Sequence, residues 1–285
     1  MFFDIEGPKR DIRWHYITVQ EKKSIQHKKS IQYIKSFQYK RSFQMSKILF
    51  VADFHGNMVA TEALDKEVKK IKPDDIWFLG DAVGKGPEGH KTLDWVRENC
   101  KHFISGNWDV GLVEASRSDD PDPYMHEFYW KQLGKERLDW LGSIPNEDEV
   151  LISGINFRLF HGRPVDINYH SYLSMDELRP GFTDTKGKLH GGFISADGHM
   201  PYIREMDLGY AINTGSVGNS LGTPRCHALL IEGELGAQEL SPISFNILSI
   251  PYDNQLAADR VDEYPEMPDK DAFKNEILNG VYRGK

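Results

Sequence analysis

From Ser46 onward, short apolar runs alternate with amphipathic stretches, and this alternation limits the possible folds more than any other feature of the sequence. The runs at 47–52, 75–80 and 101–106 have the composition of buried strands, whereas 57–71 and 90–99 carry apolar residues at helical spacing. Strand, helix, strand, helix and strand in close succession predict a parallel sheet with helices on its faces.

The second half of the chain is dense in short strands. We expect them at 149–154, 155–160, 188–195, 202–207, 210–215, 227–233 and 245–250. Residues 119–142 have the pattern of a helical insert, and residues 253–282 that of a helical tail. The predicted fold class is therefore α/β, with two packed mixed β-sheets flanked by helices in four layers. We expect the insert and the tail to frame the substrate entrance, since appendages set specificity on a shared core.

Residues 1–44 differ from the rest of the chain in charge and in repetition. They hold 10 Lys/Arg and 4 Asp/Glu, so that residues 45–285 carry 25 basic and 39 acidic residues out of the totals of 35 and 43. A six-residue repeat (KKSIQH, KKSIQY, IKSFQY, KRSFQM) fits neither the helical nor the strand period. We expect this basic extension to lie outside a domain of residues 45–285. It is either the result of a translation start placed upstream of Met45, a segment added to the protein, or a basic arm.

The composition excludes several classes of protein. No apolar run reaches the roughly 18–20 residues that span a bilayer. Cys100 and Cys226 are isolated in the sequence, which argues against a disulfide framework or a zinc knuckle. The acidic body argues against stable binding of nucleic acid. We therefore expect a cytoplasmic protein without membrane contact, and the sequence indicates no particular oligomeric state.

Five strand ends deliver polar side chains beside glycines. They are Asp53 and His55 in ADFHGN, Asp81 in LGDAVGKGP, Asn107 and Asp109 in SGNWD, His161 in LFHGRP, and Asp197 and His199 in ISADGHMPY. Any one of these alone is ordinarily a turn or helix cap, or a histidine satisfied within the core. Repeated at the sheet edge where α/β proteins present their crevice, the set predicts a metal site.

These motifs resemble those of the calcineurin-like metallophosphoesterase superfamily over nearly all of 46–250. DFHGN is similar to the family's D-x-H-G-N, GDAVGKGP to G-D-x-V-x-x-G-P, GNWD to G-N-x-D/E, FHG to the upstream histidine, and INTGSVGN to the N-x-G-S-V-G loop. The spacing, with IPYDNQLAADRV after the last strand, most resembles small prokaryotic phosphodiesterases, including those that hydrolyse dinucleoside polyphosphates such as diadenosine tetraphosphate.

The resemblance implies a hydrolase that cleaves a small phosphodiester or phosphoanhydride, with a nucleotide or another small phosphorylated molecule as substrate. It implies two divalent metal ions, Mn²⁺ first and Fe, Mg²⁺, Zn²⁺ or Ni²⁺ as alternatives, with a hydroxide between them as the nucleophile. Asp81 would bridge the two ions, and Asp81, Asn107 and His161 carry over as catalytic residues. The remaining ligands would be Asp53, His55 and His199 for one ion, and Asn107, His161 and Asp197 for the other.

The segment ADGHMPY departs from the family's G-H-x-H. In one register Gly198 and His199 are the first G-H, and Pro201 replaces the second histidine. In the other, which fits HMP better, Asp197 replaces an imidazole and favours a hard cation such as Mn²⁺ or Mg²⁺. The alternative is that Asp197 only caps a turn.

Trp108 stands where phosphatases of the superfamily often have a histidine. An indole cannot protonate a leaving group, so catalysis needs a good leaving group, such as a nucleotide phosphate, or an acid from elsewhere. The candidates for that acid are His90, His126, His170 and Arg163. Trp108 either stacks on a nucleobase or packs in the core, and Arg163 and Lys85 either clamp phosphate or lie on the surface.

Two alternative functions stay open. One is a phosphoprotein (Ser/Thr) phosphatase, against which Trp108 argues, and the other is a degenerate, non-catalytic metal- or nucleotide-binding member.

Overall fold

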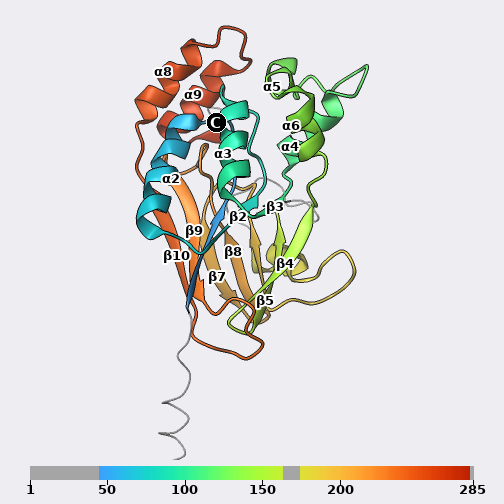
Figure 1. Cartoon of the computed structure of the whole chain (residues 1–285), viewed down its shortest axis with the longest axis vertical. Coiled ribbons are helices and arrows are strands. Elements are labelled where there is room, and N and C mark those ends of the chain that lie inside the picture. Colours follow the sequence, from blue (N-terminus) through green and yellow to red (C-terminus); the bar gives the residue numbers. More distant parts are fainter. Residues whose placement is uncertain (1–44, 163–173, 283–285) are drawn as a thin grey trace, which may run out of the picture. The chain divides into compact units, whose positions relative to one another are not determined.

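The computed structural model describes residues 45–162 and 174–282 (Figure 1). The N-terminal extension, Arg163 and His170 lie outside these residues, so the boundary at residue 45 stays a prediction. Five strands form a first mixed sheet in the order β10-β9-β1-β2-β3. Their bounds are Ser46–Val51 for β1, Asp75–Leu79 for β2, His102–Ile104 for β3, Cys226–Gly233 for β9 and Ser244–Ile250 for β10.

The parallel arrangement predicted for the first half is confirmed. β1 pairs with β2 and β2 with β3 in parallel, whereas β9 pairs antiparallel with both β1 and β10. The register places Val51 opposite Phe78 and Leu79 opposite Ile104. The three parallel strands therefore end at the same edge, and the loops that follow them meet there.

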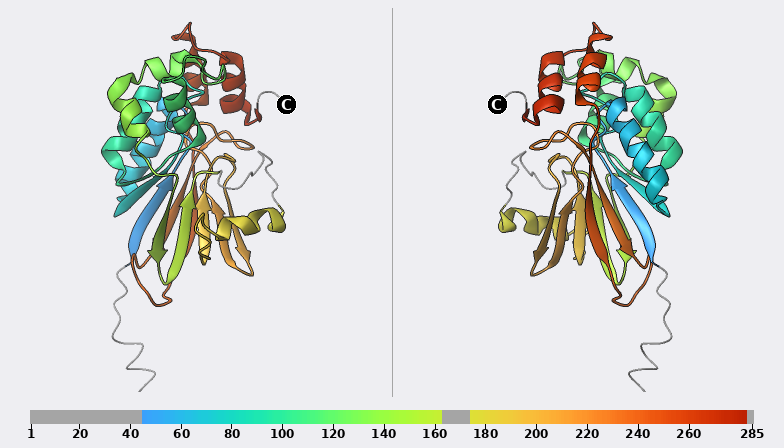
Figure 2. Two further views of the ribbon diagram at one scale, coloured as in Figure 1. Left: turned by 90° about the vertical axis from the view of Figure 1, so that its right-hand side faces the viewer. Right: turned by 90° about the vertical axis from the view of Figure 1, so that its left-hand side faces the viewer.

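A second mixed sheet has the strand order β4-β5-β6-β8-β7. Its strands are β4 (Glu147–Ile152), β5 (Ile155–Phe160), β6 (Gly192–Ser195), β7 (Tyr202–Met206) and β8 (Gly209–Asn213). β5, β6 and β8 run parallel to one another, and β4 and β7 pair antiparallel at the two edges. Figure 2 shows the two sheets as adjacent layers.

Helices cover the outer sides of the sheets. In order along the chain they are α2 (Met58–Ile71), α3 (Gly89–Asn99), α4 (Asn107–Ala115), α5 (Glu127–Lys131), α6 (Gly134–Leu141), α7 (Met175–Leu178), the 3-10 helix η1 (Arg179–Phe182), α8 (Asn254–Asp262) and α9 (Lys270–Asn279). Within 45–162 and 174–282, none of these helices is long and apolar enough to cross a membrane.

The alternation of side chains along β1 explains the layers. Leu49 and Val51 pack on one face, with Leu64 of α2 and Leu93 of α3, whereas Ile48 and Phe50 face the second sheet. All of these side chains are fully buried. A smaller apolar cluster joins α8 and α9 to α2, and another covers the outer face of the second sheet beneath η1. The predicted fold class of two packed mixed sheets flanked by helices is confirmed.

Three helices of the described residues lie outside the helical segments predicted from the sequence: α7, η1 and α4. α4 begins at Asn107, shortly after β3, at a residue that the sequence offered as a ligand at a strand end or as a turn or helix cap. Its signal in the sequence is the spacing of Trp108, Leu112 and Val113, which are buried on one face.

Candidate metal centre

The loops after β1 and β2 are hydrogen-bonded to each other, because the two strands are parallel neighbours. The N–H of Asp53 donates to the Gly80 carbonyl at 2.9 Å, and the N–H of His55 donates to the Asp81 carbonyl at 3.2 Å. Asp53, His55 and Asp81 are all buried. The backbone therefore fixes the three side chains close to one another before any ligand is considered.

The end of β3 and the start of α4 complete this edge. Trp108 donates its backbone N–H to Asp81 Oδ1 at 2.9 Å, which leaves Oδ2 free to face the centre. Gly106 precedes Asn107, and a Cβ at Gly106 would lie 2.0 Å from Asp81 Oδ1. Only glycine therefore lets α4 approach Asp81 closely enough to bring Asn107 into the centre.

The second sheet supplies the remaining side chains from the ends of β5 and β6. His161 follows β5, and Asp197 and His199 follow β6. The N–H of Ala196 donates to the His161 carbonyl at 2.6 Å, which holds the two loops together. A Cβ at Gly162 would lie 2.2 Å from the Cβ of Asp197, so the loops meet in close contact.

Backbone strain is concentrated at this centre. Asp53, His55, Asp81, Asp197 and His199 all have φ between 47° and 61°. They are five of the nine non-glycine residues with positive φ in the part of the chain that the structure describes. Such conformations are disfavoured for residues with a Cβ and persist where surrounding structure imposes them, often at functional sites.

The side chains form two overlapping groups. Asp53 Oδ1 lies 3.7 Å from His55 Nε2, 3.4 Å from His199 Nε2 and 3.7 Å from His161 Nε2. Asp81 Oδ2 lies 3.6 Å from His55 Nε2 and 3.3 Å from His161 Nε2. Asp53, His55 and His199 form one group with ligand atoms within 4.8 Å of one another, and Asp53, Asp81 and His161 form the second. Asp53 belongs to both groups and Asp81 faces both.

Backbone carbonyls orient all three imidazoles. The Nδ1 atoms of His55, His161 and His199 lie 3.2, 2.6 and 2.6 Å from the carbonyl oxygens of Val83, Leu79 and Asn219, respectively. A carbonyl only accepts, so each Nδ1 carries a proton, and each Nε2 faces the centre as the nitrogen that a cation would bind. This is the usual arrangement of histidines that bind metals.

The arrangement leaves acceptors facing one another without a donor. His55 Nε2 and His199 Nε2 lie 3.1 Å apart, and both carboxylate oxygens of Asp53 are buried without a hydrogen-bond partner. Burying such groups is costly unless something satisfies them. A cation between them does so, and the residues present therefore fit a metal ion.

Asn107 and Asp197 lie beside the second group. The Asn107 side-chain oxygen lies 3.1 to 3.2 Å from His161 Nε2, Asp81 Oδ2 and Asp197 Oδ1. An amide there either turns its NH₂ to these acceptors or presents its oxygen to a cation that they share. Asp197 Oδ1 lies 3.8 Å from His161 Nε2.

The pKa values reflect burial and crowding. Burial and the neighbouring Lys85 hold the pKa of His55 well below its ordinary value. Burial also lowers the pKa of His161, but the Asp81, Asp53 and Asp197 carboxylates outweigh it and raise that pKa well above its ordinary value. Burial raises the pKa of Asp197. The excess of carboxylates around His161 is the field that a divalent cation would neutralise.

Asp109 has a role that the sequence reading missed. Its carboxylate accepts from the backbone N–H groups of Asp81 at 2.8 Å, Gly106 at 3.0 Å and Ala82 at 3.2 Å. Burial and the nearby Asp81 raise the pKa of Asp109 to about 7. Asp109 thus fixes the turn that carries Asp81, although as a polar residue after a strand it looked like one more ligand.

Trp108 and Lys85, which the sequence suggested as substrate-binding residues, both contact other residues of the protein. Trp108 is 4% exposed and packs on the rings of His55, Tyr124 and Tyr129. It lines a hollow of only about 20 Å³, so its stacking on a base stays a prediction. Lys85 Nζ donates to Asn219 Oδ1 at 3.1 Å.

Two of the candidate proton donors are engaged elsewhere. His90 Nδ1 lies 2.8 Å from Gln132 Oε1, and His126 Nδ1 accepts from the Phe128 N–H at the start of α5. Arg163 and His170 fall outside the described residues.

Comparisons with known proteins agree with this geometry. A family model described as calcineurin-like phosphoesterase matches residues 46–224. An uncharacterized protein of Methanocaldococcus jannaschii is 29% identical over 188 residues, which cover 61% of this chain and 76% of the relative. A symmetrical bis(5'-nucleosyl)-tetraphosphatase of Psychromonas ingrahamii is 28% identical over 123 residues. The match covers 42% of this chain and only 40% of that tetraphosphatase.

Solved structures share the fold. A metallophosphoesterase from Sphaerobacter thermophilus superposes with a TM-score of 0.64 at 22% identity, covering 84% of this chain and all of that one. A hypothetical protein from Pyrococcus horikoshii OT3 superposes with a TM-score of 0.63 at 17% identity, covering 83% of this chain and 99% of that one.

Proposed function

The chain belongs to the calcineurin-like phosphoesterase family, and as a hydrolase of phosphoester bonds it needs a reaction centre; we propose that this centre is the cluster described above. The proposed activity is metal-dependent hydrolysis of a small phosphodiester or phosphoanhydride. One observation carries the proposal: two groups of buried side chains share Asp53, and within each group the ligand atoms lie within 4.8 Å of one another. This arrangement suits two adjacent divalent cations.

The proposed ligands are those named from the sequence. Asp53, His55 and His199 would hold one ion, and Asn107, His161 and Asp197 the other. Asp81 would bridge the two ions, because its Oδ2 lies 3.6 Å from His55 Nε2 and 3.3 Å from His161 Nε2. Asp53, which the two groups share, lies 3.7 Å from the same two nitrogens and is assigned to the first ion for its shorter distance of 3.4 Å to His199 Nε2. Carboxylate, imidazole and amide ligands without thiolates favour Mn²⁺, with Fe, Mg²⁺, Zn²⁺ and Ni²⁺ as the alternatives.

Bound cations would supply Lewis-acid polarisation of the phosphoryl oxygens and lower the pKa of water for attack on phosphorus. The residues of this chain keep the ligands in place for that chemistry. The backbone carbonyls hold each imidazole with its Nε2 inward, and Asp109 and the Trp108 N–H hold Asp81. These groups are positioned before substrate arrives, so little reorganisation is needed during reaction.

The substrate class follows from the leaving group. Within residues 45–162 and 174–282, the indole of Trp108 cannot protonate a leaving oxygen, and His90 and His126 already use Nδ1 in contacts with Gln132 and Phe128. A leaving group of low pKa, such as a nucleotide phosphate, needs no such acid. We therefore favour a phosphoanhydride such as a dinucleoside polyphosphate, a choice also supported by the partial match to a symmetrical bis(5'-nucleosyl)-tetraphosphatase. Cys100 and Cys226 are buried free thiols, which suits the proposed cytoplasmic location.

The test is hydrolysis of bis-p-nitrophenyl phosphate by the full chain with Mn²⁺, followed by diadenosine tetraphosphate beside a phosphopeptide. We expect turnover of the diester and of the tetraphosphate, and loss of both activities together with bound metal in Asp81→Asn. Asp259→Asn is the matched control, because Asp259 is an exposed carboxylate on α8 whose Oδ1 accepts from Gln255. Turnover that survives Asp81→Asn, or metal binding without turnover in the unmodified protein, would contradict the proposal. Preference for the phosphopeptide would indicate a phosphoprotein phosphatase instead.

A further inference from the structure

A groove leads away from the proposed metal centre on the side of Asn107 and His161. It has a volume of about 800 Å³ and runs between α4 and the start of β4, as far as Glu147 and Lys186. This volume lies within the range of pockets that bind small molecules. Val110 of α4, 38% exposed, contributes an apolar wall.

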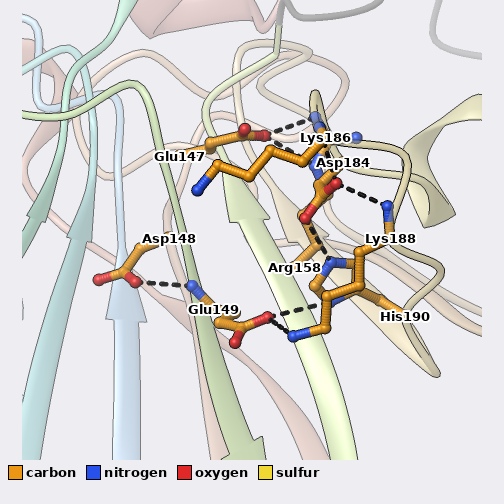
Figure 3. A pocket seen from close by; sticks show the side chains of 8 residues that line it. All are labelled: Glu147, Asp148, Glu149, Arg158, Asp184, Lys186, Lys188 and His190. Carbon is orange, nitrogen blue, oxygen red and sulfur yellow. Dashed lines mark hydrogen bonds and ion pairs between the residues drawn. The ribbon is translucent and has the colours of Figure 1, made fainter.

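A second hollow, of about 350 Å³, adjoins the groove and shares Glu147 and Lys186 with it. Its walls are charged, but the charges are mostly paired (Figure 3). Arg158 pairs with Glu147 at 2.7 Å, Lys188 pairs with Glu149, and His190 Nε2 lies 3.3 Å from Asp184 Oδ2. The positively charged side chains in these pairs are therefore already neutralised by carboxylates of the protein.

The same contacts fix the loop that carries Lys186. Asp184 Oδ1 accepts from the backbone N–H groups of Lys186 at 2.9 Å and Lys188 at 2.8 Å. The neighbouring Thr185 donates its hydroxyl to Glu147 Oε1. These hydrogen bonds hold the backbone of the loop in place, so the side chain of Lys186 extends from a fixed position.

Lys186 is the exception to the pairing. Its Nζ has no hydrogen-bond or ion-pair partner among the described residues, and Figure 3 shows the side chain extending away from Asp184 toward the Glu147 side. Glu147 is already neutralised by Arg158 and bonded by Thr185. Glu114, on the α4 wall, repels anions from that side of the groove. An anion in the groove is therefore attracted to the Lys186 side.

We propose that Lys186 binds a phosphate of the substrate beyond the one that is cleaved, so that the preferred substrates carry a chain of at least two phosphates along this groove. This inference rests on the proposed phosphohydrolase function. It adds a specificity determinant that lies in none of the metal-binding motifs.

The experiment compares bis-p-nitrophenyl phosphate, which has one phosphate, with diadenosine tetraphosphate, which has four, using the full chain with Mn²⁺. For Lys186→Gln we expect kcat/KM on the tetraphosphate to fall about ten- to a hundredfold, mainly through KM, as for loss of one charge-assisted hydrogen bond. Activity on the diester should stay within about twofold, because an uncharged nitrophenyl group makes no such bond. Lys186→Arg should retain most of the activity, and the effect of Lys186→Gln should shrink at 1 M salt.

Lys188→Gln is the matched control, since Lys188 lies in the same loop but is paired with Glu149. The inference is overturned if Lys186→Gln changes both substrates equally, if it changes neither, or if Lys188→Gln has the same selective effect. It is also overturned if the unmodified protein cleaves the diester but not the tetraphosphate. Cleavage of neither substrate by the unmodified protein would instead overturn the proposed function, and this outcome is visible before any variant is made.

Discussion

The side-chain amide of Asn219 donates a hydrogen bond to Glu276 Oε2 at 2.9 Å and so joins α9 to the loop beneath His199. The backbone oxygen of Asn219 accepts from His199 Nδ1 at 2.6 Å. Asn219 and Glu276 are 0% and 3% exposed. α9 lies beyond residues 46–224, which the family model matches. The C-terminal helix therefore supports a proposed ligand from outside the matched region.

Removing the Glu276 carboxylate should weaken metal binding at the His199 site. Loss of groups that orient metal ligands commonly costs about ten- to a hundredfold in affinity, and we expect a loss of that size for Glu276→Ala in a calorimetric Mn²⁺ titration. Glu276→Gln keeps an oxygen that can accept from Asn219, so it should recover most of the affinity. Asp271→Asn, an exposed change in the first turn of α9, serves as the control. Equal affinities for Glu276→Ala and Asp271→Asn would rule out this supporting role.

Gly106→Ala should disable the centre without unfolding the protein. The added Cβ would lie 2.0 Å from Asp81 Oδ1, so Asp81 or the start of α4 must move. Displacement of a reacting group by about 1 Å can cost a hundredfold in rate, and we expect a loss of at least about that size in diester hydrolysis. Gly89→Ala is the matched control, because its Cβ would lie 3.4 Å from Val83, near ordinary contact distance. Thermal unfolding should show both variants folded, and full activity in Gly106→Ala would contradict the account of this close approach.

The sequence was sufficient to predict the two sheets and the cluster of side chains at their edges. Strands that are buried on both faces, such as β1 and β2, appear as continuous apolar runs. The polar residues that follow parallel strands must meet, because such strands end at one edge. Asp53, His55, Asp81 and His161 were recognisable for that reason.

The residues that support the cluster were not predictable in the same way. Asn219 and Glu276 are 57 residues apart, and neither pattern nor spacing indicates that they touch. Asp109 resembles a ligand in the sequence, and only the three N–H groups around its carboxylate show its structural role. Lys186 belongs to no motif, and its importance appears only when its neighbours prove to be paired.

His227 should make the stability of the fold sensitive to acid. Burial lowers its pKa to about 4 from the ordinary value of 6.5, and the positive charge of Arg225 acts in the same direction. The unfolded chain therefore binds this proton more readily than the folded one. The stabilisation is complete above pH 6.5 and is lost as the pH falls toward 4.

We expect this residue to account for about 1 to 2 kcal/mol of the decrease in unfolding free energy between about pH 7 and 4.5, after allowance for solvent screening. His227→Gln, which cannot be protonated, should flatten the decrease measured by urea denaturation at several pH values. The slope against pH is the relevant quantity, because the substitution also changes stability at neutral pH. An unchanged slope would show that His227 is not the source.

Asp197 decides whether the second cation is held by a carboxylate. The residue is 6% exposed, has φ of 59°, and lies with Oδ1 near Asn107 and His161. If it is a ligand, Asp197→Ala should reduce the metal content from two ions to one and weaken hydrolysis of the diester. Asp197→His offers an imidazole and should restore part of the second site, with a shift toward softer metals such as Zn²⁺. Asp148→Ala, at an exposed carboxylate on β4, is the control. Metal analysis after gel filtration separates the two roles. If Asp197 only caps a turn, Asp197→Ala should bind as many ions as the unmodified protein; if Asp197 is a ligand, the variant should bind fewer.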